Sequence, residues 1–205
     1  MNCACVAAGF RPGGKSRVRQ HSQEPKTSIS SVKLALMRVL GIDCGTECTG
    51  FGVVELCANG KLLCLRYGAI KLSSREALAS RLATIFAQLG GVIQQQQPEQ
   101  VAIEEVFYSV NAKSALKLGQ VRGVAMLAAS SAGLHVAEYA PLSIKSAVVG
   151  YGRAEKHQVQ HMVARLLDLR EVPEPADAAD ALAIAICHLN TSVTLQRQRQ
   201  RSATA

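Results

Sequence analysis

Four carboxylate side chains lie next to apolar segments, where the need for a polar, solvent-exposed surface does not explain them. Asp43 directly follows a run of small apolar residues, and Glu104 follows another. Asp177 and Asp180 are three residues apart in a segment made otherwise of alanine, leucine and isoleucine. On a helix this spacing places both side chains on one face. Carboxylates that converge from such segments are candidates for holding a metal ion or for acid–base catalysis.

Two predicted strands would position the first two of these acids. The segments "RVLGID" (residues 38–43) and "QVAIEEVF" (residues 100–107) both have the apolar content of buried strands. If the two strands are parallel neighbours, their carboxyl ends lie side by side, at the usual ligand site of an α/β sheet. Four carboxylates gathered there would repel one another unless a cation were present.

Oxygen ligands of this kind suit Mg²⁺ or Mn²⁺. Two such ions about 4 Å apart can stabilise both the attacking water and the leaving oxygen of a phosphodiester. The pattern of acids therefore predicts a nuclease.

The remaining segments predict an α/β fold with a mixed five-stranded sheet, three antiparallel strands followed by two parallel ones, flanked by helices. Asn59-Gly60 favours a tight turn between the second and third strands, and Ser73 with Glu76 forms a capping-box pattern that predicts a helix start. "LHVAEY" (residues 134–139) predicts the fifth strand, and helical patterns follow until about residue 189.

Charge and composition divide the chain of 205 residues into one domain with two tails. Residues 1–36 hold six basic residues and one acid, and residues 191–205 hold three arginines and no acid. Of the 23 basic and 15 acidic residues, 14 of each remain between. We therefore expect disordered basic tails around a domain at residues 37–190, and a cytoplasmic protein, since no apolar run reaches the ~18 residues of a membrane span.

Simpler interpretations exist for every one of these signals. An aspartate after a strand is commonly a turn former, Asp177 could cap a helix, and Glu104 could lie on a strand rim. Cys44 and Cys48 could combine with two histidines four residues apart into a zinc site, but the sequence contains no recognisable zinc framework. All the acids occurring together, in this order and with apolar flanks, favour a functional site.

The segment from Met37 to about Leu189 resembles the RuvC family of Holliday junction resolvases, whose fold is ribonuclease H-like. The resemblance is carried by "GIDCGTECTGFGVVE", "AIEEVF", "NAKSALKLGQVRGVA", "YAPLSIKSAVVGYGRAEKHQVQHMV" and "DAADALAIAI". It implies that the four catalytic and metal-binding acids are Asp43, Glu104, Asp177 and Asp180, with Asp43 shared by both metals. Cys44 stands where the family often has proline.

The resemblance also implies DNA contacts. Phe107 would stack on an unpaired base, and Lys145 and Lys156 would lie near the scissile phosphate. Three further basic residues are weaker DNA-binding candidates, because a helix also needs a solvated face: Lys113, Lys117 and Arg122.

A family member would be a homodimeric crossover junction endodeoxyribonuclease that acts in recombination and DNA repair. It would use two Mg²⁺ per subunit, which Mn²⁺ can replace, and nick two opposed strands of a four-way DNA junction symmetrically. The products would carry 5′-phosphate and 3′-hydroxyl ends. The implied partners are the RuvA and RuvB branch-migration proteins, with no membrane involved.

Three other functions compete with this one, and the sequence leaves one of them open, a related resolvase-like nuclease with a different substrate. "GIDCGT" followed by "TGFG" is also typical of the first phosphate loop of actin-like and sugar-kinase ATPases, but this chain is short and has no second such loop. A non-catalytic junction-binding protein on the same fold would be expected to lose at least one acid, and all four are present.

Overall fold

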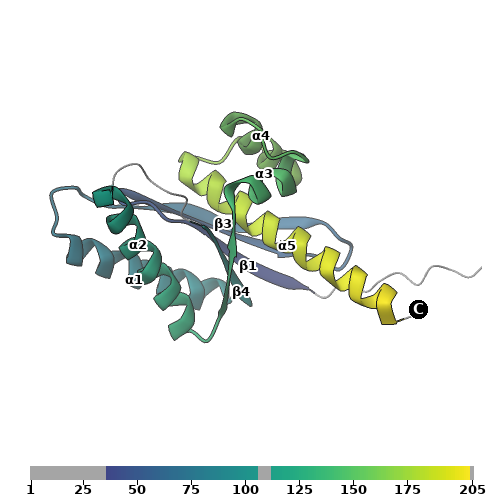
Figure 1. Ribbon diagram of the computed structural model, residues 1–205, viewed down its shortest axis with the longest axis horizontal. Coiled ribbons are helices and arrows are strands. Elements are labelled where there is room, and N and C mark those ends of the chain that lie inside the picture. Colours follow the sequence, from purple (N-terminus) through teal and green to yellow (C-terminus); the bar gives the residue numbers. More distant parts are fainter. Residues whose placement is uncertain (1–35, 106–111, 204–205) are drawn as a thin grey trace, which may run out of the picture. The chain divides into compact units, whose positions relative to one another are not determined.

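The computed structural model describes residues 36–105 and 112–203, and a single five-stranded sheet runs through them (Figure 1). Its strand order is β3-β2-β1-β4-β5, in which β1 pairs antiparallel with β2 and parallel with β4. The strands are β1 (Met37–Asp43), β2 (Cys48–Leu56), β3 (Leu62–Lys71), β4 (Gln100–Glu104) and β5 (His135–Tyr139). The predicted fold class, three antiparallel strands followed by two parallel ones, is confirmed.

Helices cover both faces of this sheet, α1 and α2 on one side and α3, α4 and α5 on the other (Figure 1). A hydrophobic core lies on each face of the sheet, and alternate residues of β1 belong to different cores. Val39 packs toward α5, while Leu40 packs toward α1 and α2. This alternation explains why β1 is apolar from Val39 to Ile42. The helices are α1 (Leu78–Gln96), α2 (Ala112–Ser131), α3 (Pro141–Val149), α4 (Lys156–Leu166) and α5 (Ala176–Ala203).

The helix α5 lies unusually close to β1 and β2. A Cβ atom on Gly41 would overlap with the carbonyl oxygen of Ala181, and one on Gly50 with the carbonyl oxygen of Asp177. Glycine is therefore required at both strand positions, since any larger residue would lift the helix off the sheet. The first half of α5 is almost wholly buried as a result.

The C-terminal half of α5 differs from the sequence-based expectation of a disordered tail after residue 190. The helix continues to Ala203. Glutamine and arginine are good helix formers, and the segment contains no glycine or proline to end the helix. By length and composition alone α5 could cross a membrane, but 61% of its most apolar stretch is buried inside the domain, as in many core helices.

A buried polar chain ties α5 to the parallel half of the sheet. The Tyr139 hydroxyl lies 2.8 Å from His188 Nδ1, and His188 Nε2 lies 2.6 Å from the Gln100 side-chain oxygen. Burial, with a contribution from His135, lowers the pKa of His188. A neutral imidazole with both nitrogens paired has the character of a structural core residue.

Candidate active site

Asp43 and Glu104 end two neighbouring strands of the sheet. The parallel register of β1 and β4 pairs Ile42 with Ile103, so the two acids that follow lie side by side. The sequence-based expectation that these strands are parallel neighbours is thus correct. Both side chains are only partly buried, at the carboxyl ends of the two strands.

The first turns of α5 bring the other two acids to the same edge. Asp43 pairs in the sheet with Gly50, and the backbone of Asp177 rests directly on that glycine. Asp180 follows one helical turn later and, like Asp177, is partly exposed. The close packing of α5 on glycine therefore places its two acids beside Asp43.

The electrostatics of the site show that the other three acids act on Asp43 and that Asp180 acts on Glu104. Burial, together with Asp180, Glu104 and Asp177 in that order, raises the pKa of Asp43 to about 7. Burial and Asp180 also raise the pKa of Glu104, while Lys145 and Lys156 oppose that rise. Such a cluster carries more negative charge than its surroundings balance, so it favours a cation.

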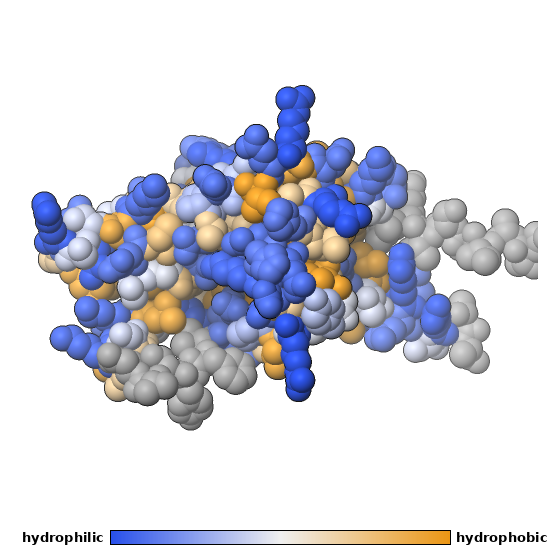
Figure 2. All heavy atoms as spheres, turned by 90° about the horizontal axis from the view of Figure 1, so that it is seen from above, coloured by the Kyte–Doolittle hydropathy of each residue, from blue (hydrophilic) through white to orange (hydrophobic). Residues whose placement is uncertain are grey.

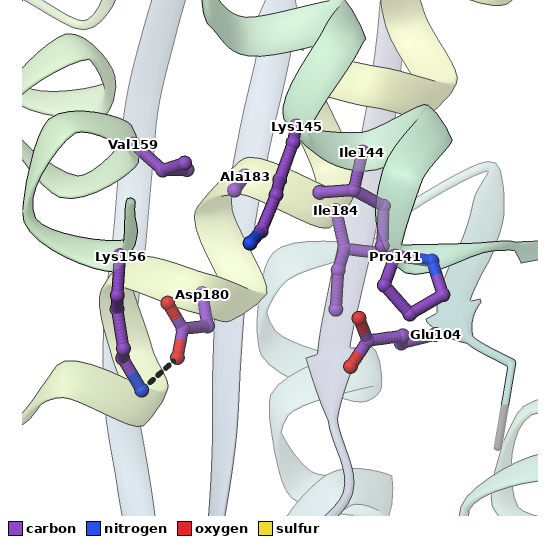
Figure 3. A pocket seen from close by; sticks show the side chains of 9 residues that line it. All are labelled: Glu104, Pro141, Ile144, Lys145, Lys156, Val159, Asp180, Ala183 and Ile184. Atoms are coloured by element: carbon purple, nitrogen blue, oxygen red, sulfur yellow. Dashed lines mark ion pairs between the residues drawn. The ribbon is translucent and has the colours of Figure 1, made fainter. Parts of the chain in front are cut away.

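Two lysines supply positive charge on one side of this cluster. Lys156 Nζ lies 2.6 Å from an Asp180 carboxylate oxygen, and this contact is the main cause of the raised pKa of Lys156. A small cavity of about 180 Å³ lies beside this ion pair and is lined by Glu104 and Asp180. Lys145 extends into it from α3 (Figure 3). The floor of the cavity is apolar, formed in part by Ile144. The cavity thus holds two acids and two cations in contact with solvent.

The donor set suits a hard divalent metal ion. It consists of carboxylate oxygens, which Mg²⁺ and Mn²⁺ prefer, and positive charge opposes the rise in the pKa values of Asp43 and Glu104. Among residues 36–105 and 112–203, no preformed group of three or more acidic, histidine or cysteine side chains that could hold a metal ion is present. Mg²⁺ does not need one, because it keeps several of its waters and uses few protein ligands. The residues therefore fit such an ion as an open site.

Two side chains around the loop after Asp43 were not predicted from the sequence. The Cys48 thiol forms a hydrogen bond with Asp177, and burial raises its pKa to about 11. Arg81 of α1, almost fully buried, donates from Nη1 to the Thr46 carbonyl oxygen at 3.0 Å. The contact between Arg81 and Thr46 had one sequence signal, which is an arginine among the apolar residues on one face of a predicted helix. Burial raises the pKa of Cys44 to about 12, so this thiol stays protonated.

The predicted DNA contacts fall into different places. Phe107 lies outside the described residues. Lys113 is exposed and Lys117 half-buried on α2. Arg122 faces inward, where its Nε donates to the Glu104 carbonyl oxygen at 3.3 Å and its guanidinium pairs with Glu138. Arg122 thus holds the end of β4 in place.

Comparisons with known proteins agree with this geometry. Residues 39–188 match the family model described as crossover junction endodeoxyribonuclease RuvC. The RuvC of Koribacter versatilis is 67% identical over 156 residues, covering 76% of this chain and 94% of that protein.

The solved structure of Thermus thermophilus RuvC superposes with a TM-score of 0.72 at 38% identity, covering 77% of this chain and 96% of that one. The same protein in complex with a Holliday junction substrate gives a TM-score of 0.71 at 35% identity, with the same coverage.

Proposed function

Because the chain belongs to the RuvC family of crossover junction endodeoxyribonucleases, we propose that its four clustered carboxylates are the catalytic residues of a Holliday junction resolvase. The protein is an endonuclease with a ribonuclease H-like fold that resolves Holliday junctions. The observation that supports the site is the convergence of acids from β1, β4 and α5, which together with burial, the larger cause, raises the pKa of Asp43 to about 7. An ATPase that uses the loop after Asp43 for phosphates has no comparable use for all four acids.

Nucleases of this family depend on a metal ion. We infer that Asp43, Glu104, Asp177 and Asp180 hold two Mg²⁺ per subunit, which Mn²⁺ can replace. The metal would supply Lewis-acid stabilisation of the charge that develops on the phosphate and the leaving oxygen.

The chain's own cations complete the site. Lys145 and Lys156 line the cavity beside Glu104 and Asp180, where they can balance the charge of a phosphodiester entering it. Lys156 pairs with Asp180 in the protein without DNA. Its ammonium group therefore already lies in the lining of the cavity that the phosphodiester would enter. Arg122 and Cys48 orient the end of β4 and Asp177 respectively, and neither needs to touch DNA.

A homodimer would place two such sites on one junction. A two-fold axis matches the near-symmetry of a four-way junction, so that two opposed strands are nicked in symmetric positions to give 5′-phosphate and 3′-hydroxyl ends. We further infer that the enzyme works in the cytoplasm with RuvA and RuvB, on the basis of its family.

One face of α2 supports the dimer proposal. Leu116 and Leu127 on this helix are 71% and 56% exposed. Gly119 and Gly123, between them in sequence, have no described atom within 4 Å of where a Cβ would stand. A helix face with exposed leucines and small residues allows close approach of a second helix, and within the described part of the protomer nothing occupies it.

Replacing Gly123 by leucine separates the two roles of this helix. We expect the monomer to become more stable by up to about 1 kcal/mol, because leucine is a far better helix former than glycine. The dimer should weaken at least about tenfold, since the side chain would prevent close approach of a second helix. Sedimentation equilibrium measures the dimer, and Gly90→Leu on α1, another glycine with open space around it, is the control. An unchanged dimer would exclude this face as the interface.

The test of the proposed function uses a labelled four-way junction and a linear duplex of the same sequence. With Mg²⁺ we expect symmetric nicks on the junction alone, because the carboxylates need a divalent ion to bring a phosphate among them. EDTA should abolish cleavage and leave junction binding in place. Denaturing gels report the nicks and gel shifts the binding. Cleavage that persists in EDTA, or an intact junction in Mg²⁺, would contradict the proposal.

A further inference from the structure

A groove lies at the end of the sheet opposite to the four acids. Leu56, which lines it, pairs with Met37 at the start of β1, whereas Asp43 ends the same strand. The groove has a volume of about 860 Å³ and lies between the β2–β3 turn, the C-terminal end of α4 and the C-terminal half of α5. The α5 residues that line it, Asn190 to Arg197, follow the last residue that matches the family model.

Three basic residues, one from each of these elements, line the groove, which we call the distal groove: Lys61, Arg165 and Arg197. All three are exposed, and no ion pair found among the described residues involves them. Asp168 is the single acid in the lining. From residue 181 to its end, α5 contains no acid at all. The distal groove is therefore cationic.

The helix α4 joins the active site to the distal groove. Its first residue, Lys156, contacts Asp180 near the start of α5, and Arg165 in its last turn lines the groove with Asn190 and Arg197. The two helices therefore run side by side in the same direction. Along α5, Asp180 and Arg197 are about 25 Å apart at 1.5 Å per residue. Figure 2 looks from above onto the side that carries α3 and α4 in Figure 1, and it shows hydrophilic side chains in the middle of this face with hydrophobic ones interspersed.

We propose that the distal groove binds the sugar–phosphate backbone of one duplex arm of the junction, about seven base pairs from the cleaved phosphate. The inference rests on the proposed function, since the substrate itself supplies the polyanion. Duplex DNA carries a phosphate every 3.4 Å along each strand, so an arm leaving the active site along α4 reaches Arg165 and Arg197 after about 25 Å. A protein partner with an acidic segment would also have complementary charge. The helix α4, however, leads from the cleavage site to the distal groove, which favours a DNA arm that leaves the active site.

The test compares junctions with arms of about six and about twenty base pairs, closed by hairpin loops, so that only the long arms reach the groove. The wild-type protein should bind the long-arm junction about tenfold more tightly. The triple variant Lys61→Gln, Arg165→Gln, Arg197→Gln should lose this difference. Its salt slope on long arms should fall by about two to three, since each lost phosphate contact removes about 0.9. Cleavage of the short-arm junction should stay unchanged, because none of the three residues lies near the acids.

The matched control removes the same charge from another side of α5. Arg199 stands about 200° around the helix from Arg197 and does not line the groove. Arg197→Gln alone should weaken long-arm binding, and Arg199→Gln should not. If the triple variant keeps the arm-length preference, the proposal is overturned, and an acidic protein becomes the better candidate for the groove. If wild-type protein cleaves neither junction, it is the proposed function that fails.

Discussion

Asp43→Asn is expected to abolish junction cleavage and, in the absence of metal, to make the protein more stable at alkaline pH. The loss of cleavage should reach about a thousandfold or more, because Asp43 lies among the acids of the proposed metal site and the other three act on its charge. Junction binding should persist, since the lysines and the rest of the DNA surface are unchanged. The gain in stability follows from the pKa of the same carboxyl group.

Burial and the neighbouring acids raise the pKa of Asp43 to about 7 from its usual 3.8. Between these values the folded protein keeps a proton that the unfolded chain has lost, so stability falls as pH rises from about 4 to 7. Above pH 7 the whole penalty is present. Asparagine removes it, so the variant should gain about 2 kcal/mol at pH 8 and almost nothing at pH 4.

Thermal unfolding in EDTA at several pH values measures this gain, which corresponds to about 4–8 °C in Tm for a domain of this size. Glu171→Gln, an exposed carboxylate outside the acid cluster, is the control and should change neither cleavage nor the pH profile. Wild-type cleavage by Asp43→Asn would remove this residue from the site. A variant less stable than the wild type at pH 8 would show that the acids do not repel one another.

Sequence patterns were sufficient for the parts of the fold that depend on local order. The apolar content of β1, the Asn59-Gly60 turn and the spacing of Asp177 and Asp180 are local signals, and the strands and the helix that they predicted are present. The adjacency of Asp43 and Glu104 follows once β1 and β4 are parallel, because register then fixes the pair.

The starts and ends of helices were harder to predict, since several nearby residues can cap a helix. Ser73 and Glu76 match the capping pattern, yet α1 begins at Leu78 after Ala77, without a side-chain cap. A true capping box, formed by Glu155 and Gln158 at the start of α4, was not predicted. Serine is the commoner signal at this position, so a glutamate in the same role gives little warning.

Contacts between distant segments could not be predicted from one sequence. The Cys48 hydrogen bond with Asp177 and the placement of Arg81 under Thr46 depend on how α5 and α1 settle on the sheet. The same holds for the distal groove, whose three cations come from three separate elements. The contact between Cys48 and Asp177 and the distal groove both depend on where α5 lies, and glycines in β1 and β2 decide that position.

Gly50→Ala should therefore damage the active site without changing any functional group. The new Cβ would overlap with the carbonyl group of Asp177, so the start of α5 must move away from β2. Overpacking of a rigid backbone contact should lower the free energy of unfolding by about 3 kcal/mol. A displacement of about 1 Å in a catalytic group can cost about a hundredfold in rate, so cleavage should fall by that order.

The measurement separates misplacement from unfolding by assaying cleavage well below the melting temperature, where circular dichroism shows the variant to be folded. Gly90→Ala is the matched control, since a Cβ there meets no described atom and alanine favours the helix. That variant should gain up to about 1 kcal/mol and cleave normally.

A double variant tests whether the effect of Gly50→Ala passes through Asp177. If it does, adding Asp177→Asn to Gly50→Ala should reduce cleavage little beyond Asp177→Asn alone, because both changes remove the same contribution. Fully multiplicative losses would mean that Gly50 acts on another part of the site. A folded Gly50→Ala protein with wild-type cleavage would show that α5 tolerates the shift and that its position does not set the rate.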